Sequence, residues 1–261
     1  MNLEKITNGA VKIASEVSRF IQKESEGFTL KDAEIKGTND LVSYVDKTSE
    51  LMLVDKLKKL LPGAGVLAEE GYEEHSDLKW IIDPLDGTTN FVHGVPTYAI
   101  SIGLADHDEV IAGVVFEINH SEAFYAWKDG GAFLNKRPIK VSRTASLQDS
   151  LISTGFPVQN FSMIKEYLAL VEHLIRNSHG LRRVGSAATD LAYVACGRYD
   201  AFFEYNLKPW DVAAGAVLIQ EAGGTVTDFS GKDDYIYGKQ ILGAGGLYGE
   251  LLRLIQERWY P

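Results

Sequence analysis

The sequence predicts a mixed α/β protein in which helices and β-sheets pack in layers. Three observations predict this class: an amphipathic segment near the N-terminus, strand-like segments in the middle, and alternating short strands and helices after residue 151. No linker, internal repeat or low-complexity tract separates the two halves. We therefore expect an α+β half, residues 1–145, and an α/β half, residues 146–261, to pack as one compact unit.

Two helices are expected near the N-terminus. Apolar residues recur there at helical spacing, at Leu3, Ile6, Ala10, Ile13, Ala14, Val17, Phe20 and Ile21. A polar turn over residues 36–40 follows, and a second helix is expected from Asp46 to Leu61, where Pro62 and Gly63 end it. Asp46 could cap this helix or reach a metal site, and the local pattern leaves both open.

The next segments predict strands. Residues 66–68 form a short apolar run that ends at Glu69, and a surface excursion leads to a return strand at 80–82. If the two strands run side by side, Glu69 lies beside Asp83. Residues 98–105, 110–118 and 122–127 then read as an antiparallel meander that serves as scaffold.

The second half alternates strands and helices, which is typical of α/β proteins with sites at strand ends. Strands are expected at residues 151–153, 181–184, 199–205, 225–227 and 241–244, and helices at residues 163–176, 187–195, 212–221 and 247–257. Asp211 is expected to be the N-cap of the helix over 212–221, because aspartate is favoured there.

Composition narrows the possible partners and location. The 261 residues are 45% hydrophobic and 24% charged, within the ordinary globular range. The formal charge of -10 argues against nucleic acid, whose binding needs clustered Lys and Arg. The single cysteine, Cys196, excludes an intramolecular disulfide and favours a reducing compartment. No apolar run approaches the ~18 residues of a membrane span, so we expect a cytoplasmic protein without a membrane partner.

The stretch over residues 80–91 carries the most specific chemical signal. Asp83 and Asp86 stand three residues apart, with Pro84 between them expected to bar simple continuation of a central strand. Small and hydroxyl-bearing residues follow, as at the start of a helix. Mg²⁺ takes oxygen ligands, and a helix N-terminus receives phosphate, so the stretch predicts a metal-assisted phosphatase. Alternatively, Asp83 is a turn residue and Asp86 a helix cap, with no metal.

Further motifs place this stretch in a family pattern. The acid loop 68–71, the stretch 83–91 and the segment 210–215 occur in that order, and together they closely resemble the inositol monophosphatase family of Mg²⁺-dependent, lithium-sensitive phosphatases. The match extends to residues 40–46, 185–188 and 223–224, so it spans nearly the whole chain. The resemblance implies a layered α-β-α-β-α sandwich of the sugar-phosphatase type and a homodimer.

The resemblance also implies a metal site with two to three Mg²⁺ ions. Its ligands would be the side chains of Glu69, Asp83, Asp86 and Asp211 and the carbonyl of Leu85. The residues implied in catalysis are Thr88, which would position the attacking water, Asp46 and Glu69. Asp46 would hydrogen-bond Thr88 or help to hold a further, weaker metal. Water would attack phosphorus in line, without a covalent phosphoenzyme.

The substrate would be a small phosphate monoester. Gly87, Thr88 and Thr89 would give backbone N–H groups to its phosphate, Glu204 would accept hydroxyls of an inositol ring, and Ser186, Ala187 and Asp211 would complete the pocket. Glu204 could instead be a surface acid at a strand end.

Several functions share this pattern. The segment 185–195, followed by Glu204 and residues 208–211, looks most like bacterial inositol monophosphatases. Fructose-1,6-bisphosphatase and 3′-phosphoadenosine 5′-phosphate phosphatase remain alternatives, because they share the metal carboxylates. Arg182 and Arg183 could contact a second substrate phosphate or belong to a dimer interface. A non-enzymatic protein that binds a partner is the alternative of another class.

Overall fold

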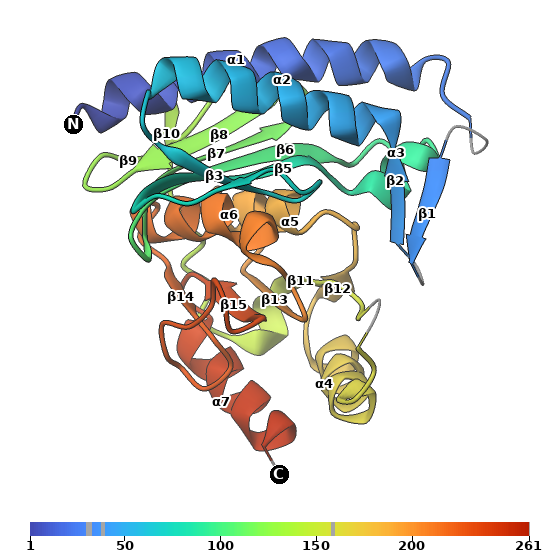
Figure 1. Ribbon diagram of the computed structural model, residues 1–261. Coiled ribbons are helices and arrows are strands. Elements are labelled where there is room, and N and C mark those ends of the chain that lie inside the picture. The colour runs from blue at the N-terminus through green and yellow to red at the C-terminus, as the bar shows by residue number, and fades with distance from the viewer. Residues whose placement is uncertain (30–32, 38–39, 158–159, 261) are drawn as a thin grey trace.

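The computed structural model describes residues 1–29, 33–37, 40–157 and 160–260. Thr38 and Asn39 of the expected polar turn lie outside the described residues. Five layers are stacked in the order helices, sheet, helices, sheet, helices (Figure 1). This arrangement confirms the predicted α-β-α-β-α sandwich. The division of the chain after residue 145 stays a prediction.

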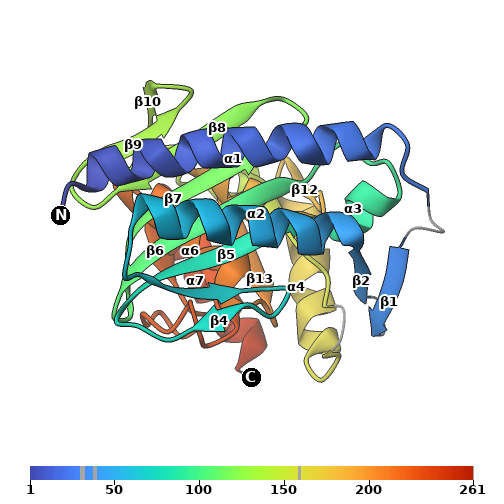
Figure 2. The same ribbon diagram turned by 45° about the horizontal axis from the view of Figure 1, so that its top comes forward.

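The first layer consists of two long helices, α1 (Leu3–Ser25) and α2 (Tyr44–Leu60), which lie side by side across one face of a sheet (Figure 2). Asn2 caps α1, because its side chain accepts a hydrogen bond from the Lys5 amide at 2.9 Å. In the sequence between the two helices, β1 (Ala33–Gly37) and β2 (Asp40–Ser43) form a small antiparallel ribbon. Both helices were predicted, α1 from its apolar spacing and α2 from its polar start and from Pro62 and Gly63 after its end.

The second layer is a sheet of eight strands in the order β10-β9-β8-β7-β6-β5-β3-β4. The strands are β3 (Gly65–Ala68), β4 (Glu73–Glu74), β5 (Leu78–Asp86), β6 (Ala99–Asp106), β7 (Glu109–Glu117), β8 (Glu122–Trp127), β9 (Gly131–Leu134) and β10 (Arg137–Ile139). All neighbours are antiparallel except β3 and β5. The structure thus confirms the meander.

Pro84 lies inside β5, and the strand does not continue simply past it. The strand continues to Asp86, but its pairing with β6 becomes irregular between Asp83 and Asp86. Proline lacks an N–H group, and an irregularity of this kind is where a strand tolerates it.

The remaining layers come from the second half of the chain. The middle helices are α5 (Ala187–Ala195) and α6 (Pro209–Glu221), and the outer ones are α4 (Ile164–Asn177) and α7 (Tyr248–Trp259). Between them lies a sheet in the order β12-β11-β13-β15-β14, formed by β11 (Leu151–Thr154), β12 (Gly180–Arg182), β13 (Ala201–Tyr205), β14 (Thr225–Thr227) and β15 (Gln240–Ala244). The short helices α3 (Thr88–Val92) and η2 (Leu147–Asp149) complete the fold.

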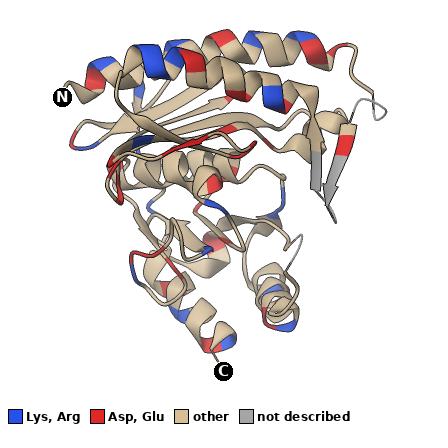
Figure 3. Cartoon of the chain, in the orientation of Figure 1, with Lys and Arg blue, Asp and Glu red and all other residues tan. Residues whose placement is uncertain are grey.

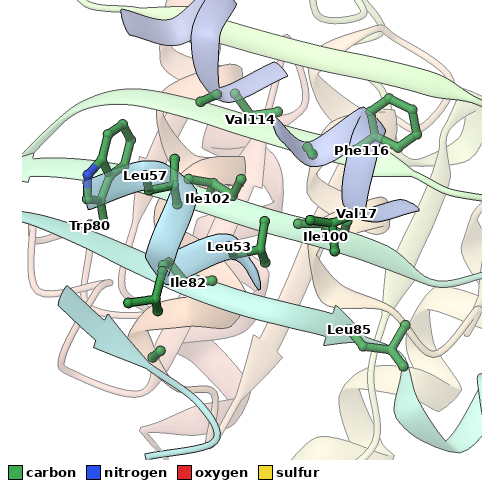
Figure 4. Packing of buried hydrophobic residues seen from close by; sticks show 14 of the residues in the cluster. Val17, Leu53, Leu57, Trp80, Ile82, Leu85, Ile100, Ile102, Val114 and Phe116 are labelled. Carbon is green, nitrogen blue, oxygen red and sulfur yellow. The ribbon is translucent and has the colours of Figure 1, made fainter. Parts of the chain in front are cut away.

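The eight-stranded sheet is buried on both faces. On one face, Ile82 of β5 belongs to a cluster that includes Leu53 and Leu57 of α2 and Val17 of α1. In Figure 4, Leu53 lies near Ile82, and Val17 lies beside Ile100 of β6. On the other face, Ile81 belongs to a second cluster, which includes residues of α5 and α6. Burial of both faces explains why its central strands read as continuous apolar runs and not as alternating ones.

Several acids, among them Asp46, Asp83 and Asp190, are buried between the layers, whereas other charged residues lie on the outer helices (Figure 3). Lys and Arg alternate with Asp and Glu along α1 and α2 (Figure 3). In the described part of the chain, no helix is both long and apolar enough to cross a membrane.

Candidate metal and phosphate site

Glu69 and Asp83 lie at the ends of neighbouring parallel strands. Ala68, the last residue of β3, pairs with Ile82 of β5, and the Glu69 amide donates to the Ile82 carbonyl at 3.2 Å. Glu69 therefore lies beside Asp83, as the return strand predicted, and its side chain interacts with the Asp83 carboxyl. Asp83 is only 2% exposed. Burial, followed by the nearby charges of Glu69, Asp86 and Asp211, raises the pKa of its carboxyl well above the usual range.

Asp86 connects the two halves of the chain. Its Oδ2 accepts hydrogen bonds from Ser186 Oγ at 2.6 Å and from the Ala188 amide at 2.7 Å, and the Ala187 amide also donates to the carboxyl. These groups form the N-terminus of α5, whose dipole favours a negative charge. Burial nevertheless raises the pKa of Asp86 to about 6. Asp86 thus ends β5 and does not cap α3, whose N-cap is Gly87.

Asp211 lies in the first turn of α6, and the expectation that it is the N-cap is wrong. Lys208 is the N-cap and Pro209 the first helical residue, because proline suits a position whose N–H group would have no partner. Asp211 Oδ2 accepts from the Lys208 amide at 2.7 Å. Burial and the neighbouring Asp86 raise the pKa of Asp211 to about 7. The acids from β5 and α6 therefore interact electrostatically.

Ser43, and not Asp46, is the N-cap of α2. Asp46 is the third helical residue, where it completes a capping box with Ser43, and its other oxygen reaches Thr88. It is fully buried, and its Oδ2 accepts from the Ser43 amide at 2.8 Å and from Ser43 Oγ at 2.6 Å. Its Oδ1 lies 2.9 Å from Thr88 Oγ1, which is also 3.0 Å from the Leu85 carbonyl oxygen. Burial raises the pKa of Asp46, although the hydrogen bonds from Ser43 and Thr88 oppose the shift.

The turn before Thr88 depends on glycine. Gly87 has a φ of +98°, in the left-handed region, and a Cβ there would lie 3.2 Å from the carbonyl oxygen of Gly185. The turn therefore packs closely against the segment that precedes α5. Thr88 is partly buried and Thr89 is exposed, both in α3.

One positioning residue escaped the sequence analysis. Glu50 is 4% exposed and accepts hydrogen bonds from the amides of Glu70 at 2.6 Å and Tyr72 at 3.1 Å, so it holds the loop that follows Glu69. Its position on α2, four residues after Asp46, puts both acids on one helix face. The four-residue spacing between Asp46 and Glu50 is the feature of the sequence that could have predicted a role for Glu50.

The substrate side of the site is formed by β13 and α5. Glu204 of β13 has a pKa raised well above its usual range by burial and by Asp190, Asp211 and Asp86, with Arg183 opposing. Glu204 therefore interacts electrostatically with the acids at Asp86 and Asp211. Asp190, 1% exposed, is a second acid that the sequence analysis missed, since it lies within an otherwise apolar helix. Ser186 and Ala187 begin α5 and are both buried.

The donor chemistry fits a hard cation. Glu69, Asp83, Asp86 and Asp211 offer only carboxylate oxygens, and their mutual repulsion is what a cation would relieve. Within the described ranges, however, no group of three or more His, Cys, Asp or Glu side chains is arranged to hold a metal ion as it stands. Mg²⁺ does not require such a cage, because it is usually held by one or two carboxylates together with water and substrate phosphate.

The layered fold places the chain in the class of α/β sandwich proteins of the sugar-phosphatase type. The model of the inositol monophosphatase family matches residues 2–260, and the chain belongs to this family. This finding confirms the resemblance seen in the sequence.

Known relatives carry different names. A protein of Neisseria meningitidis serogroup B named "Putative Nus factor SuhB" is 41% identical over 252 residues, covering 95% of this chain and 97% of that protein. A "Fructose-1,6-bisphosphatase/inositol-1-monophosphatase" of Thermotoga maritima is 40% identical over 222 residues, covering 85% and 84%. The crystal structure of the extragenic suppressor protein suhB from Bartonella henselae has a TM-score of 0.90 at 38% identity, covering 96% and 98%.

Proposed function

We propose that the protein is a Mg²⁺-dependent phosphomonoester hydrolase whose preferred substrate is inositol 1-phosphate. The observation that carries the proposal is the interaction of Asp83 with Glu69, Asp86 and Asp211, three acids from separate parts of the chain. Structural acids would not be expected to gather so closely, because each raises the cost of ionising the others. A phosphatase site that binds cations needs such a set.

Mg²⁺ would supply Lewis-acid activation of water and offset the charge of the phosphate. Glu69, Asp83, Asp86, Asp211 and the Leu85 carbonyl would hold it. Thr88, fixed by Asp46, would accept a hydrogen bond from the attacking water and orient it. Backbone N–H groups of Gly87, Thr88 and Thr89 would bind phosphate oxygens.

On the ring side of the pocket, Glu204 would accept hydroxyl groups of the polyol, and Ser186 and Ala187 would line the wall beside Asp86. A ring with several hydroxyls matches an anionic acceptor better than an apolar leaving group does. The proposal therefore includes a preference for polyol phosphates.

Phosphate release, measured with Mg²⁺, tests the proposal on inositol 1-phosphate, fructose 1,6-bisphosphate and 3′-phosphoadenosine 5′-phosphate side by side. Preference for the inositol ester supports it. Preference for either other ester keeps the metal-assisted hydrolysis and rejects the assigned substrate. Absence of Mg²⁺-dependent release from all three rejects the enzymatic function.

Two alternatives rest on the names of relatives. The first alternative is a broader range of sugar-phosphate substrates, because the Thermotoga maritima relative is named for fructose-1,6-bisphosphatase as well as for inositol-1-monophosphatase. The Neisseria relative is named a putative Nus factor, so a role through a binding partner is the second. The variant Asp86→Asn separates them, because it should remove hydrolysis and leave a partner-binding role intact.

We also propose a cytoplasmic homodimer inhibited by lithium. Large apolar side chains of α4 and the segment before it are exposed, namely Phe156, Phe161, Leu168 and Ile175. Leu168 and Ile175 are seven residues apart in α4 and share one helix face. Sedimentation of the wild type and of Ile175→Lys tests the homodimer, since a buried lysine would dissociate it.

A further inference from the structure

Gly155 and Glu204 lie side by side at the ends of two parallel strands. Thr154, the last residue of β11, pairs with Phe203 of β13, so Gly155, the residue after β11, lies next to Glu204, the residue before the end of β13. A Cβ on Gly155 would lie 2.0 Å from Glu204 Oε2 and 2.1 Å from Oε1 and Cδ. The carboxylate of Glu204 therefore rests directly on the backbone of Gly155.

Backbone conformation does not explain the glycine at 155. Its φ lies outside the left-handed region, so any residue could adopt this conformation. What a larger residue lacks is space, because the Glu204 carboxylate occupies the position of the Cβ. The Glu204 carboxylate can therefore keep this position only if residue 155 has no side chain.

The backbone of Gly155 is held in place and cannot easily move away. Its carbonyl oxygen accepts a hydrogen bond from the Tyr167 hydroxyl at 2.7 Å. The preceding Thr154 Oγ1 donates to the Phe203 carbonyl at 2.7 Å and lies 3.1 Å from the same Tyr167 hydroxyl. Gly155, Thr154 and Tyr167 are all buried. A Cβ at residue 155 would therefore displace the flexible end of Glu204, and not the strand.

The surrounding charges limit where the Glu204 carboxylate can lie. Asp190, Asp211 and Asp86 repel it, and Arg183 attracts it. The Arg183 guanidinium lies 5.3 Å from the ring centroid of Phe156, the residue after Gly155. Gly155 thus contacts Glu204, and Phe156 contacts Arg183, the cation that attracts the Glu204 carboxylate.

We propose that Gly155 is a specificity-determining positioning residue, whose missing side chain sets the place of the Glu204 carboxylate and thereby selects polyol phosphates. The inference rests on the proposed function, because it assumes that Glu204 faces the substrate ring. It assigns Gly155 no contact with the reacting atoms.

The experiment compares Gly155→Ala, Glu204→Ala and the double variant with the wild type. Each is assayed with Mg²⁺ on inositol 1-phosphate and on p-nitrophenyl phosphate, whose leaving group has no hydroxyls for Glu204. Gly155→Ala should lower the ratio of the two kcat/KM values roughly tenfold, mainly through KM for the inositol ester, as expected for a weakened hydrogen bond to a charged group. The double variant should match Glu204→Ala alone, because Gly155 acts through Glu204.

Gly249→Ala in α7 is the matched control, because a Cβ there meets nothing within 4 Å and the ratio should not change. Equal losses on both esters in Gly155→Ala, or additive losses in the double variant, would overturn the inference. A crystal structure of Gly155→Ala decides the geometry independently of activity: a displaced Glu204 carboxylate supports the inference, and an unmoved one rejects it. If the wild type hydrolyses neither ester, the proposed function fails, and this structure still decides whether Gly155 positions Glu204.

Discussion

Thr88 Oγ1 lies 2.9 Å from Asp46 Oδ1, which joins the first turn of α3 to the first turn of α2. The other oxygen of Asp46 is held by Ser43, so the carboxylate cannot rotate away. A hydroxyl has one proton and two lone pairs. Since the proton faces Asp46 or the Leu85 carbonyl, a lone pair of Thr88 remains for the proton of a bound water.

Thr88→Ala should lower kcat by about 100-fold or more, because a water without this acceptor loses its orientation. The change also removes one partner of the buried Asp46 and should lower the melting temperature by roughly a few degrees. Thr88→Ser keeps the hydroxyl and should retain most of the activity. Phosphate release and thermal melting measure both effects. Wild-type kcat in Thr88→Ala would contradict the role given to this hydroxyl.

Asp86→Asn should abolish turnover and leave the fold intact. The amide oxygen can still accept from Ser186 Oγ and from the Ala188 amide, so the contact with α5 survives. What disappears is the negative charge that a cation needs, and we expect kcat/KM to fall by about 1000-fold or more. Circular dichroism checks the fold. Asp55→Asn, on the exposed side of α2, is the control and should remain active. Mg²⁺-dependent activity in Asp86→Asn would reject the proposed function.

Glu50→Gln should weaken the response to Mg²⁺. A glutamine presents one NH₂ group to the amides of Glu70 and Tyr72, where the glutamate presents two acceptors. The loop that positions Glu69 should then loosen. We expect the Mg²⁺ concentration for half-maximal activity to rise about 10-fold, as for residues that orient metal ligands. An unchanged Mg²⁺ titration would show that the loop keeps its position without Glu50.

The pH dependence of stability follows from the raised pKa values of Asp86 and Asp211. The folded values of about 6 and about 7 exceed the ordinary value of 3.8, so in this interval the folded state binds more protons than the unfolded state. The stability that these two carboxyls contribute is therefore greatest at low pH and is lost as the pH rises through about 7. Melting of the metal-free protein in EDTA should show this decline between pH 5 and pH 8.

Asp211→Asn isolates the contribution of one group. The amide can still accept from the Lys208 backbone, so the first turn of α6 should keep its cap. Relative to the wild type, its melting temperature without metal should rise from pH 5 to pH 8. Mg²⁺ should stabilise the wild type at pH 8 and have less effect on the variant. A difference in melting temperature that stays constant with pH would refute the electrostatic account.

The sequence by itself determined most elements and the order of the acids along the chain. Helical periodicity predicted α1, and the return strand predicted that Glu69 meets Asp83, which the parallel pairing of β3 and β5 confirms. These features are local, because periodicity and turn residues act within a few positions. Where two local rules competed, prediction failed: Pro209 starts α6 and Lys208 is its N-cap, so Asp211 is not the N-cap.

Only the tertiary structure decided which distant groups meet. The hydrogen bonds from Ser186 and the Ala188 amide, at the start of α5, to Asp86 join elements that lie far apart in the chain. The contact of Gly155 with Glu204 depends on the neighbouring positions of β11 and β13 in one sheet. Spacing along the chain carries no record of such contacts, because sheet register and layer packing are set by the burial of the whole core.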